Sequence, residues 1–163
     1  TASGAVRLWM GPAQVVHFRL DACGDADLAR VEDEAEIAVA GSGDVRLGDA
    51  GQAEIAIAGS GDVTLGEIHT GLNVSVAGSG DVTAARVDGA TSIAVQGSGD
   101  VLIRDGRATS LSVVIAGGGD VTHGGSAQTL DAVILGGGDV RVRHVEGEIS
   151  RSVLGGGEVV VGR

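Results

Sequence analysis

The feature that most constrains this chain is a glycine-rich motif that recurs about every 19 residues. GSGDV stands at 41–45, 59–63, 78–82 and 97–101, and GGGDV follows at 117–121 and 136–140. ACGDA at 22–26 precedes this series and GGGEV at 155–159 continues it. The acids of successive copies are separated by 19, 18, 19, 19, 20, 19 and 19 residues. Eight copies at a nearly constant period are typical of a protein built from stacked structural repeats.

Apolar and polar residues alternate between these motifs, which is the pattern of β-strands. Aliphatic residues recur at fixed distances from the acid, and those five residues before it are Leu20, Val39, Ile57, Val76, Val95, Ile115, Ile134 and Val153. One turn cannot bury such a column by itself, so successive turns must stack. The sequence therefore predicts an all-β fold, a parallel β-solenoid of about eight turns, with two clear strands and a third segment in each turn.

The repeats account for the whole chain, so we expect one solenoid domain over residues 1–163. Residues 22–163 form the regular repeats, and residues 1–21 are expected to form a partial turn and a cap that includes Trp9, Met10, Pro12 and Phe18. Residues 25–40 have good helix formers and no glycine, and a helix is the alternative there. Several of their apolar residues nevertheless fall in the columns, which favours strands: Leu28, Val31, Ile37 and Val39.

Composition limits the core and the partners. Trp9 and Phe18 are the only aromatic residues, so the interior must be a thin layer of aliphatic side chains. The net charge of −11 repels phosphate backbones and anionic lipid, which argues against nucleic-acid and membrane-surface binding. No apolar run approaches the roughly 20 residues of a spanning helix. With Cys23 as the only cysteine, no internal disulfide is expected.

The GSGDV corner, with I-x-V before it and V-x-L after it, resembles the bacterial auto-transporter adhesin head GIN domain family. The resemblance covers nearly all of the chain from about Gly4 onward. It implies a right-handed parallel β-helix in an exported protein that is periplasmic, attached to the outer membrane or located at the cell surface. The chain departs from the family pattern where GGGD replaces GSGD in its later half, and in lacking aromatic residues near its C-terminus.

The stacked acids are the most regular polar feature. Neighbouring carboxylates about 4.8 Å apart would repel each other by about 0.9 kcal/mol in water. We expect each carboxylate to accept amide hydrogens of its own corner, as in an Asx turn, which would offset this repulsion. Calcium ions along the ladder are the alternative, because hard oxygen ligands suit them. The calcium candidates are Asp44, Asp62, Asp81, Asp100, Asp120 and Asp139.

Catalytic and cofactor sites are not expected. The stacked serines Ser42, Ser60, Ser79 and Ser98 have no recurring base beside them, and Cys23 is interpreted as filling the same slot. Of the four histidines, only His123 falls in an inward column, so no metal cluster is predicted. Turns without loop insertions give no walls for the cleft of a carbohydrate-active enzyme, which is the most distant alternative.

One outward face becomes more apolar toward the C-terminal end. Early turns carry alanine and serine four and six residues before the acid, whereas later turns carry the predicted interface residues Val114, Val133, Leu135 and Leu154. Apolar patches of this kind usually mark an interface. We therefore expect a non-catalytic envelope or cell-surface scaffold that self-associates as a homodimer or higher oligomer, or binds a surface glycan or an envelope protein. An end-to-end polymer that stacks through free β edges is the alternative.

Overall fold

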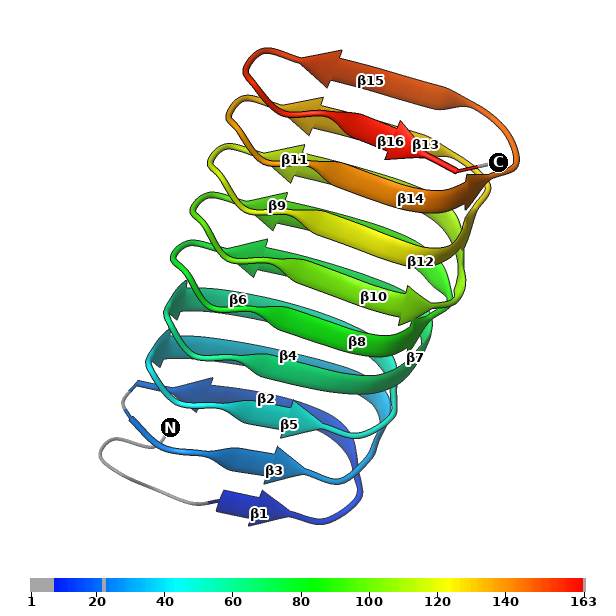
Figure 1. Cartoon of the computed structure of the whole chain (residues 1–163). Helices are drawn as coiled ribbons and strands as arrows, with labels where there is room; N and C mark the ends of the chain where they lie inside the picture. Colours follow the sequence, from blue (N-terminus) through cyan, green and yellow to red (C-terminus); the bar gives the residue numbers. More distant parts are fainter. Residues whose placement is uncertain (1–7, 22, 163) are drawn as a thin grey trace.

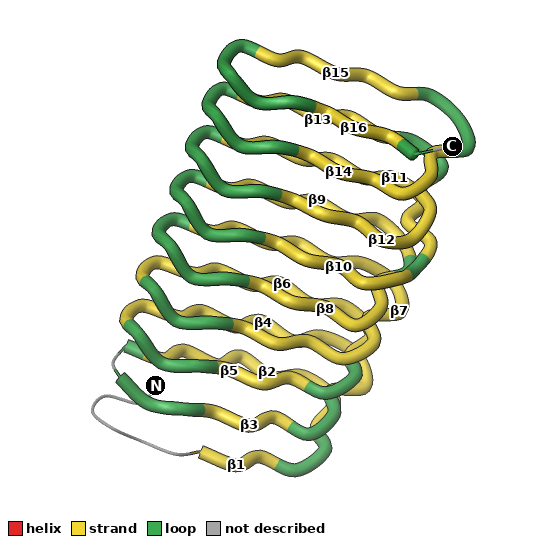
Figure 2. The backbone as a smooth tube through the Cα atoms, in the orientation of Figure 1, coloured by secondary structure: helices red, strands yellow, loops and turns green. Residues whose placement is uncertain are grey.

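The computed structural model describes residues 8–21 and 23–162, which form sixteen strands and no helix (Figures 1 and 2). The strands are, in chain order, β1 (Leu8–Met10), β2 (Ala13–Leu20), β3 (Ala26–Leu28), β4 (Val31–Gly41), β5 (Val45–Leu47), β6 (Ala50–Gly59), β7 (Val63–Val76), β8 (Val82–Val87), β9 (Gly89–Val95), β10 (Val101–Asp105), β11 (Arg107–Ile115), β12 (Val121–Ala127), β13 (Leu130–Ile134), β14 (Val140–Val145), β15 (Ile149–Val153) and β16 (Val159–Val161).

The strands form a two-sided solenoid in which every recorded pairing is parallel. One side consists of β1, β3, β5, the first part of β7, β8, β10, β12, β14 and β16, and the other of β2, β4, β6, the second part of β7, β9, β11, β13 and β15. In Figure 1 the near strands run left to right and the far strands right to left as the chain climbs, so the coil is right-handed. The predicted fold class is therefore confirmed.

The register of the turns follows the columns expected from the sequence. The residue after each acid pairs with its equivalent in the next turn, as in Val82↔Val101 and Val101↔Val121. The predicted third segment is present as a short paired stretch at the bend, where Ile68 pairs with Val87. It does not form a separate sheet, because β7 continues through this bend without a break.

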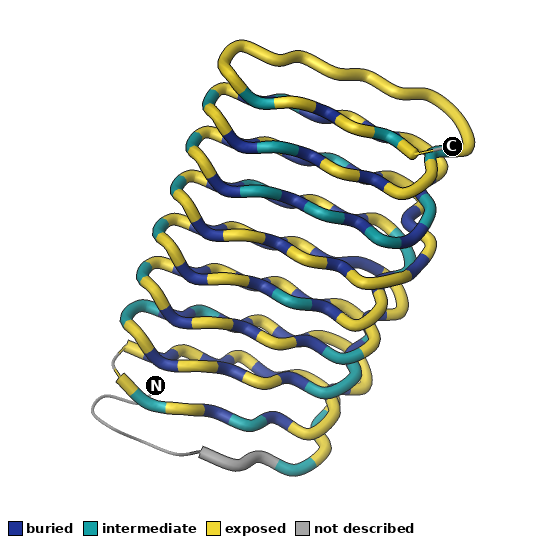
Figure 3. Tube along the Cα trace, viewed as in Figure 1, coloured by how far each residue is buried: buried dark blue, intermediate teal, exposed yellow. Residues whose placement is uncertain are grey.

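The core is the thin aliphatic layer between the two sides. Buried and exposed residues alternate along most strands, as Figure 3 shows. Residues 25–40 contain β3 and most of β4 and no helix, and Ile37 and Val39 are buried there. Of the residues assigned to the cap, Phe18 is buried in its inward column, whereas the side chains of Trp9 and Met10 lie outside the described residues.

Close stacking of the corners explains why glycine recurs in the motif. A Cβ atom added at Gly80 would lie 2.2 Å from the carbonyl oxygen of Gly61 in the preceding turn. Gly106, at the opposite bend, has a φ of 132°, a conformation that L side chains rarely adopt. Glycine is therefore required at these two positions for different reasons, one steric and one conformational.

Candidate functional site

The acidic ladder is a chain of hydrogen bonds between turns. Oδ1 of each of six stacked aspartates accepts the backbone N–H of the acid in the following turn, at distances from 2.8 to 3.2 Å. Asp100, for example, accepts the amide of Asp120 at 2.8 Å. The carboxylates accept backbone amides, as the sequence predicts. The predicted donor is wrong, because the amide belongs to the next turn and not to the carboxylate's own corner. Each carboxylate therefore links two turns.

The calcium prediction concerns these same six aspartates, which are Asp44, Asp62, Asp81, Asp100, Asp120 and Asp139. Among the described residues, no three His, Cys, Asp or Glu side chains are arranged so that they could hold one metal ion. Arg141 contacts two members of the ladder, at 3.5 Å from Asp120 Oδ2 and 2.8 Å from Asp139 Oδ2. An arginine thus supplies positive charge at the C-terminal part of the ladder, and calcium binding there stays an untested alternative to the structural role.

The serine positions of the motif also stack. Sγ of Cys23 lies 3.0 Å from Oγ of Ser42, 19 residues later, so the cysteine occupies the serine slot of the preceding turn as expected. The Cys23 side chain is exposed.

The predicted interface residues lie on the outward face of the far sheet, beside the glycine corners. Val114 pairs with Val133 in adjacent turns. Val114 is 38% exposed, Leu135 50% and Leu154 71%, whereas Val133 is half-buried. The structure thus places the four side chains on neighbouring turns of one face.

Two adjacent columns of this face are free of charge over seven turns, although charged residues such as Glu36, Glu54 and Asp131 lie elsewhere on it. From the turn of Asp44 onward, the positions four residues before the acid are Ala40, Ala58, Ala77, Gln96, Ala116, Leu135 and Leu154, and those six before it are Ala38, Ala56, Ser75, Ala94, Val114, Val133 and Ser152. On a chain with a net charge of −11, two adjacent uncharged columns form a distinct surface. We call this surface the neutral face.

A groove of about 750 Å³ lies at the opposite bend, where β8, β10, β12 and β14 end (Figure 1). Its charged lining contains three arginines and two aspartates, which are Arg86, Arg107, Arg143, Asp88 and Asp105. His69 and His144 also line it, and part of the lining is glycine: Gly89, Gly106, Gly124 and Gly125. Sequence analysis missed this groove because no loop insertion marks it.

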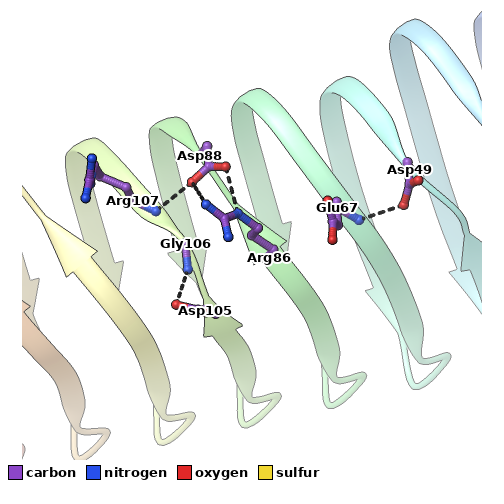
Figure 4. Close-up of polar contacts among 7 residues, drawn as sticks. All are labelled: Asp49, Glu67, Arg86, Asp88, Asp105, Gly106 and Arg107. Atoms are coloured by element: carbon purple, nitrogen blue, oxygen red, sulfur yellow. Dashed lines mark hydrogen bonds and ion pairs between the residues drawn. The ribbon is translucent and has the colours of Figure 1, made fainter.

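Asp88 organises one wall of the groove (Figure 4). The Arg86 guanidinium donates to both of its carboxylate oxygens, from Nε at 2.9 Å and from Nη2 at 3.4 Å, and the backbone N–H of Arg107 donates to Oδ1 at 2.8 Å. The hydrogen bond from Arg86, assisted by the Arg107 amide, holds the pKa of the Asp88 carboxyl below its usual value. Asp88 therefore stays ionised and fixes Arg86 beside it.

His123 lies in the core, in the column between Ile103 and Val142, as the sequence predicts. Its Nδ1 accepts the backbone N–H of Gly125 at 3.1 Å, whereas its buried Nε2 has no hydrogen-bond partner in the described structure. Burial lowers the pKa of the imidazole, because the protonated ring would lose its hydration. His123 is therefore neutral, and only one of its two ring nitrogens has a hydrogen-bond partner in the described structure.

Comparison with known protein families identifies the family of this chain. Residues 18–104 and 87–162 each match the family model described as "Putative auto-transporter adhesin, head GIN domain". The chain belongs to this family. The two matches together run from β2 to β16, so the family model covers nearly the whole solenoid of this GIN-domain chain. No curated protein and no solved structure matches the chain.

The family description indicates an adhesin-like protein that is exported or located at the cell surface. In the described part of the chain, no helix is long and apolar enough to cross a membrane.

Proposed function

We propose that this GIN-domain chain is a non-catalytic scaffold of the bacterial envelope or cell surface that forms a homodimer through its neutral face. The single observation that carries the proposal is the row of large apolar side chains on that face, where Val114, Leu135 and Leu154 are exposed on adjacent turns. The family description supports the adhesin-like role and the location. Turns of 18 to 20 residues leave no loops to wall a catalytic cleft, which supports the non-catalytic part.

A second copy of the chain is the partner that best fits the neutral face. Two molecules that each carry a net charge of −11 repel one another, and contact through uncharged columns brings the fewest like charges together. The columns are also flat and consist of alanine and serine in the earlier turns. In an antiparallel pair with a two-fold axis, the large residues of one copy would pack against the small residues of the other, and the assembly would close.

The strength of such a dimer can be bounded. A two-fold dimer would bury eight large aliphatic side chains, four from each copy, and each is on average about half covered already in the monomer. At about 1.5–3 kcal/mol for a fully exposed side chain, their burial would contribute at most about 6–12 kcal/mol. Association costs about 4–15 kcal/mol in lost freedom of motion. These ranges overlap, so we expect a weak dimer that must be sought at high protein concentration.

End-to-end stacking competes with this arrangement but is less favourable. On the last described turn, Ile149 and Val153 are 43% and 40% exposed on the inward side. Arg151 lies between Ile149 and Val153 on the same inward side, because it pairs with the buried Ala132 of the preceding turn. A second copy placed over this turn would cover the guanidinium in an apolar layer, which is costly unless the charge finds a partner.

Sedimentation velocity over a wide concentration range tests the proposal. We expect the wild type to form a dimer and the variant Val133→Glu, Leu135→Lys to stay monomeric. The control variant Thr64→Glu, Thr83→Lys introduces the same two charges on the outward face of the near sheet and should dimerise like the wild type. A monomeric wild type at high concentration would refute the proposal, and a Val133→Glu, Leu135→Lys variant that still forms polymers would favour contacts through the rod ends.

A further inference from the structure

We propose that the groove at the bend between the two sheets binds a carboxylate-bearing sugar, such as a uronic acid unit of an acidic polysaccharide. The inference rests on the adhesin-like role but not on dimerisation, because the groove lies at the bend where β8, β10, β12 and β14 end, whereas the neutral face lies on the far sheet beside the glycine corners. It is carried by Arg107 and Arg143, two of the residues that line this groove.

Among the sites described above, the groove alone has a positive local charge, although the chain as a whole is acidic. Three arginines against two aspartates give its lining a net charge of +1 with its histidines neutral, whereas the whole chain carries −11. Surrounding acids would repel a polyanion such as a nucleic acid, with one charge on every unit of its backbone. A sugar acid brings a single carboxylate on a largely neutral, hydroxylated body, which suits a small positive site.

The three arginines differ in their availability. Arg86 is held by both oxygens of Asp88, so its charge is already paired. Arg107 and Arg143 make no ion pair with any residue in the described ranges 8–21 and 23–162. The backbone of Arg107 is fixed because its N–H donates a hydrogen bond to Asp88 Oδ1 at 2.8 Å. A guanidinium presents a planar pair of donors that matches a carboxylate, so these two arginines are the expected contacts to the sugar acid.

The rest of the lining fits the hydroxyl groups of a sugar. Asp105 is an exposed carboxylate whose Oδ1 accepts the backbone N–H of Gly106 at 2.8 Å, and its acceptors match sugar hydroxyl donors. Thr109 and Ser126 add hydroxyls that both donate and accept. Gly124 and Gly125 add no side chain to the lining between Asp105 and Arg143, because a Cβ atom at either would lie 2.0–2.2 Å from a carbonyl oxygen of the preceding turn.

Isothermal titration calorimetry with an acidic trimer, in which one galacturonic acid unit lies between two galactose units, tests the inference. A trimer of galactose has the same body without the carboxylate, and sodium acetate supplies a carboxylate without the sugar. We expect saturable binding of the acidic trimer, with at least about tenfold weaker binding of the other two ligands. Equal binding of galactose trimer or of acetate would overturn the proposal, as would no binding of the acidic trimer at millimolar concentration.

Matched variants localise the binding. Arg107→Gln and Arg143→Gln should each weaken binding of the acidic trimer by about tenfold or more, as expected for a lost charge-assisted hydrogen bond. Arg46→Gln is the control, because Arg46 lies on β5 away from the groove and loses the same charge. If Arg46→Gln weakens binding as much as the groove variants, only general electrostatic attraction is at work and the proposed site is wrong. Circular dichroism melts confirm that each variant is folded, and sedimentation of the same samples reports dimerisation separately.

Discussion

The hydrogen bonds between turns in the acidic ladder give a quantitative prediction at Asp100. Its Oδ1 accepts the Asp120 amide at 2.8 Å, and its neighbours in the ladder are Asp81 and Asp120. Asp100→Asn keeps an acceptor oxygen and removes the charge, whereas Asp100→Ala removes both. Because the two variants lose the same charge, the difference between their free energies of unfolding isolates one neutral hydrogen bond, about 0.5–1.5 kcal/mol.

The effect of the charge itself follows from the spacing of the turns. At about 4.8 Å in water, each neighbouring carboxylate repels Asp100 by about 0.9 kcal/mol, and salt at physiological strength reduces this repulsion. The carboxylate of Asp100 makes a stronger hydrogen bond to the Asp120 amide than the side-chain amide oxygen of Asp100→Asn does, by about 1 kcal/mol. These two effects nearly cancel, so Asp100→Asn should unfold within about 0.5 kcal/mol of the wild type in physiological salt and gain relative stability at low salt.

Urea unfolding followed by circular dichroism measures these differences. If Asp100→Ala and Asp100→Asn are equally stable, the hydrogen bond to Asp120 contributes nothing and the structural interpretation of the ladder is wrong. The same melts with millimolar calcium and with chelator test the prediction that the ladder is structural against the calcium alternative. A wild type that calcium stabilises strongly, beside an Asp100→Asn variant that it does not, would identify the ladder as a metal site.

Two further predictions concern the core. The pKa of His123 in the folded protein lies below its unfolded value of 6.5, so its contribution to stability should be complete above pH 6.5 and decrease as the pH falls below that value. In denaturant melts between pH 7.5 and 5.5, His123→Val should lack this decrease. A His123→Val variant with the same pH profile as the wild type would contradict the assignment. Val76→Asp places a carboxylate between Ile57 and Val95 in a fully buried column, and should lower the free energy of unfolding by more than about 4 kcal/mol or prevent folding. Ser75→Asp, at the adjacent outward position, should lower it by less than about 1 kcal/mol. Similar thermal melts for the two variants would refute the inward position of Val76.

Sequence periodicity predicts which residues share a column, and therefore most of the fold. The pairing of Val82 with Val101, the inward position of His123 and the outward position of Leu135 all follow from counting residues from the acid. Columns are predictable because parallel stacking repeats one side-chain environment in every turn. The same counting places residues 25–40 in strands against their helical propensity, since burial of Ile37 and Val39 outweighs that propensity.

Contacts that depend on small offsets between turns are not predictable in this way. The period places Asp100 over Asp81, but it does not say whether Oδ1 reaches an amide of its own corner or of the next one. The groove is hidden for a related reason, because Arg86 and Arg107 belong to different turns and Asp88 brings them together by bonding to both. Such contacts are set by rotamers and by shifts in register at the bend, which a repeat alone does not determine.

The locations of the two proposed surfaces have a consequence for adhesion. The neutral face lies beside the glycine corners and the groove lies at the opposite bend, so we expect a dimer formed through the face to leave both of its grooves accessible. A single open groove with two free guanidinium groups would bind one sugar acid weakly. Two grooves held on one rigid dimer can engage the same polysaccharide, and the second binding event then occurs at a high effective concentration, which can strengthen overall binding by about 10²–10⁴. Weak self-association and weak sugar binding would thus reinforce each other on a polymeric ligand, and the Val133→Glu, Leu135→Lys variant should lose this gain while keeping its affinity for the trimer.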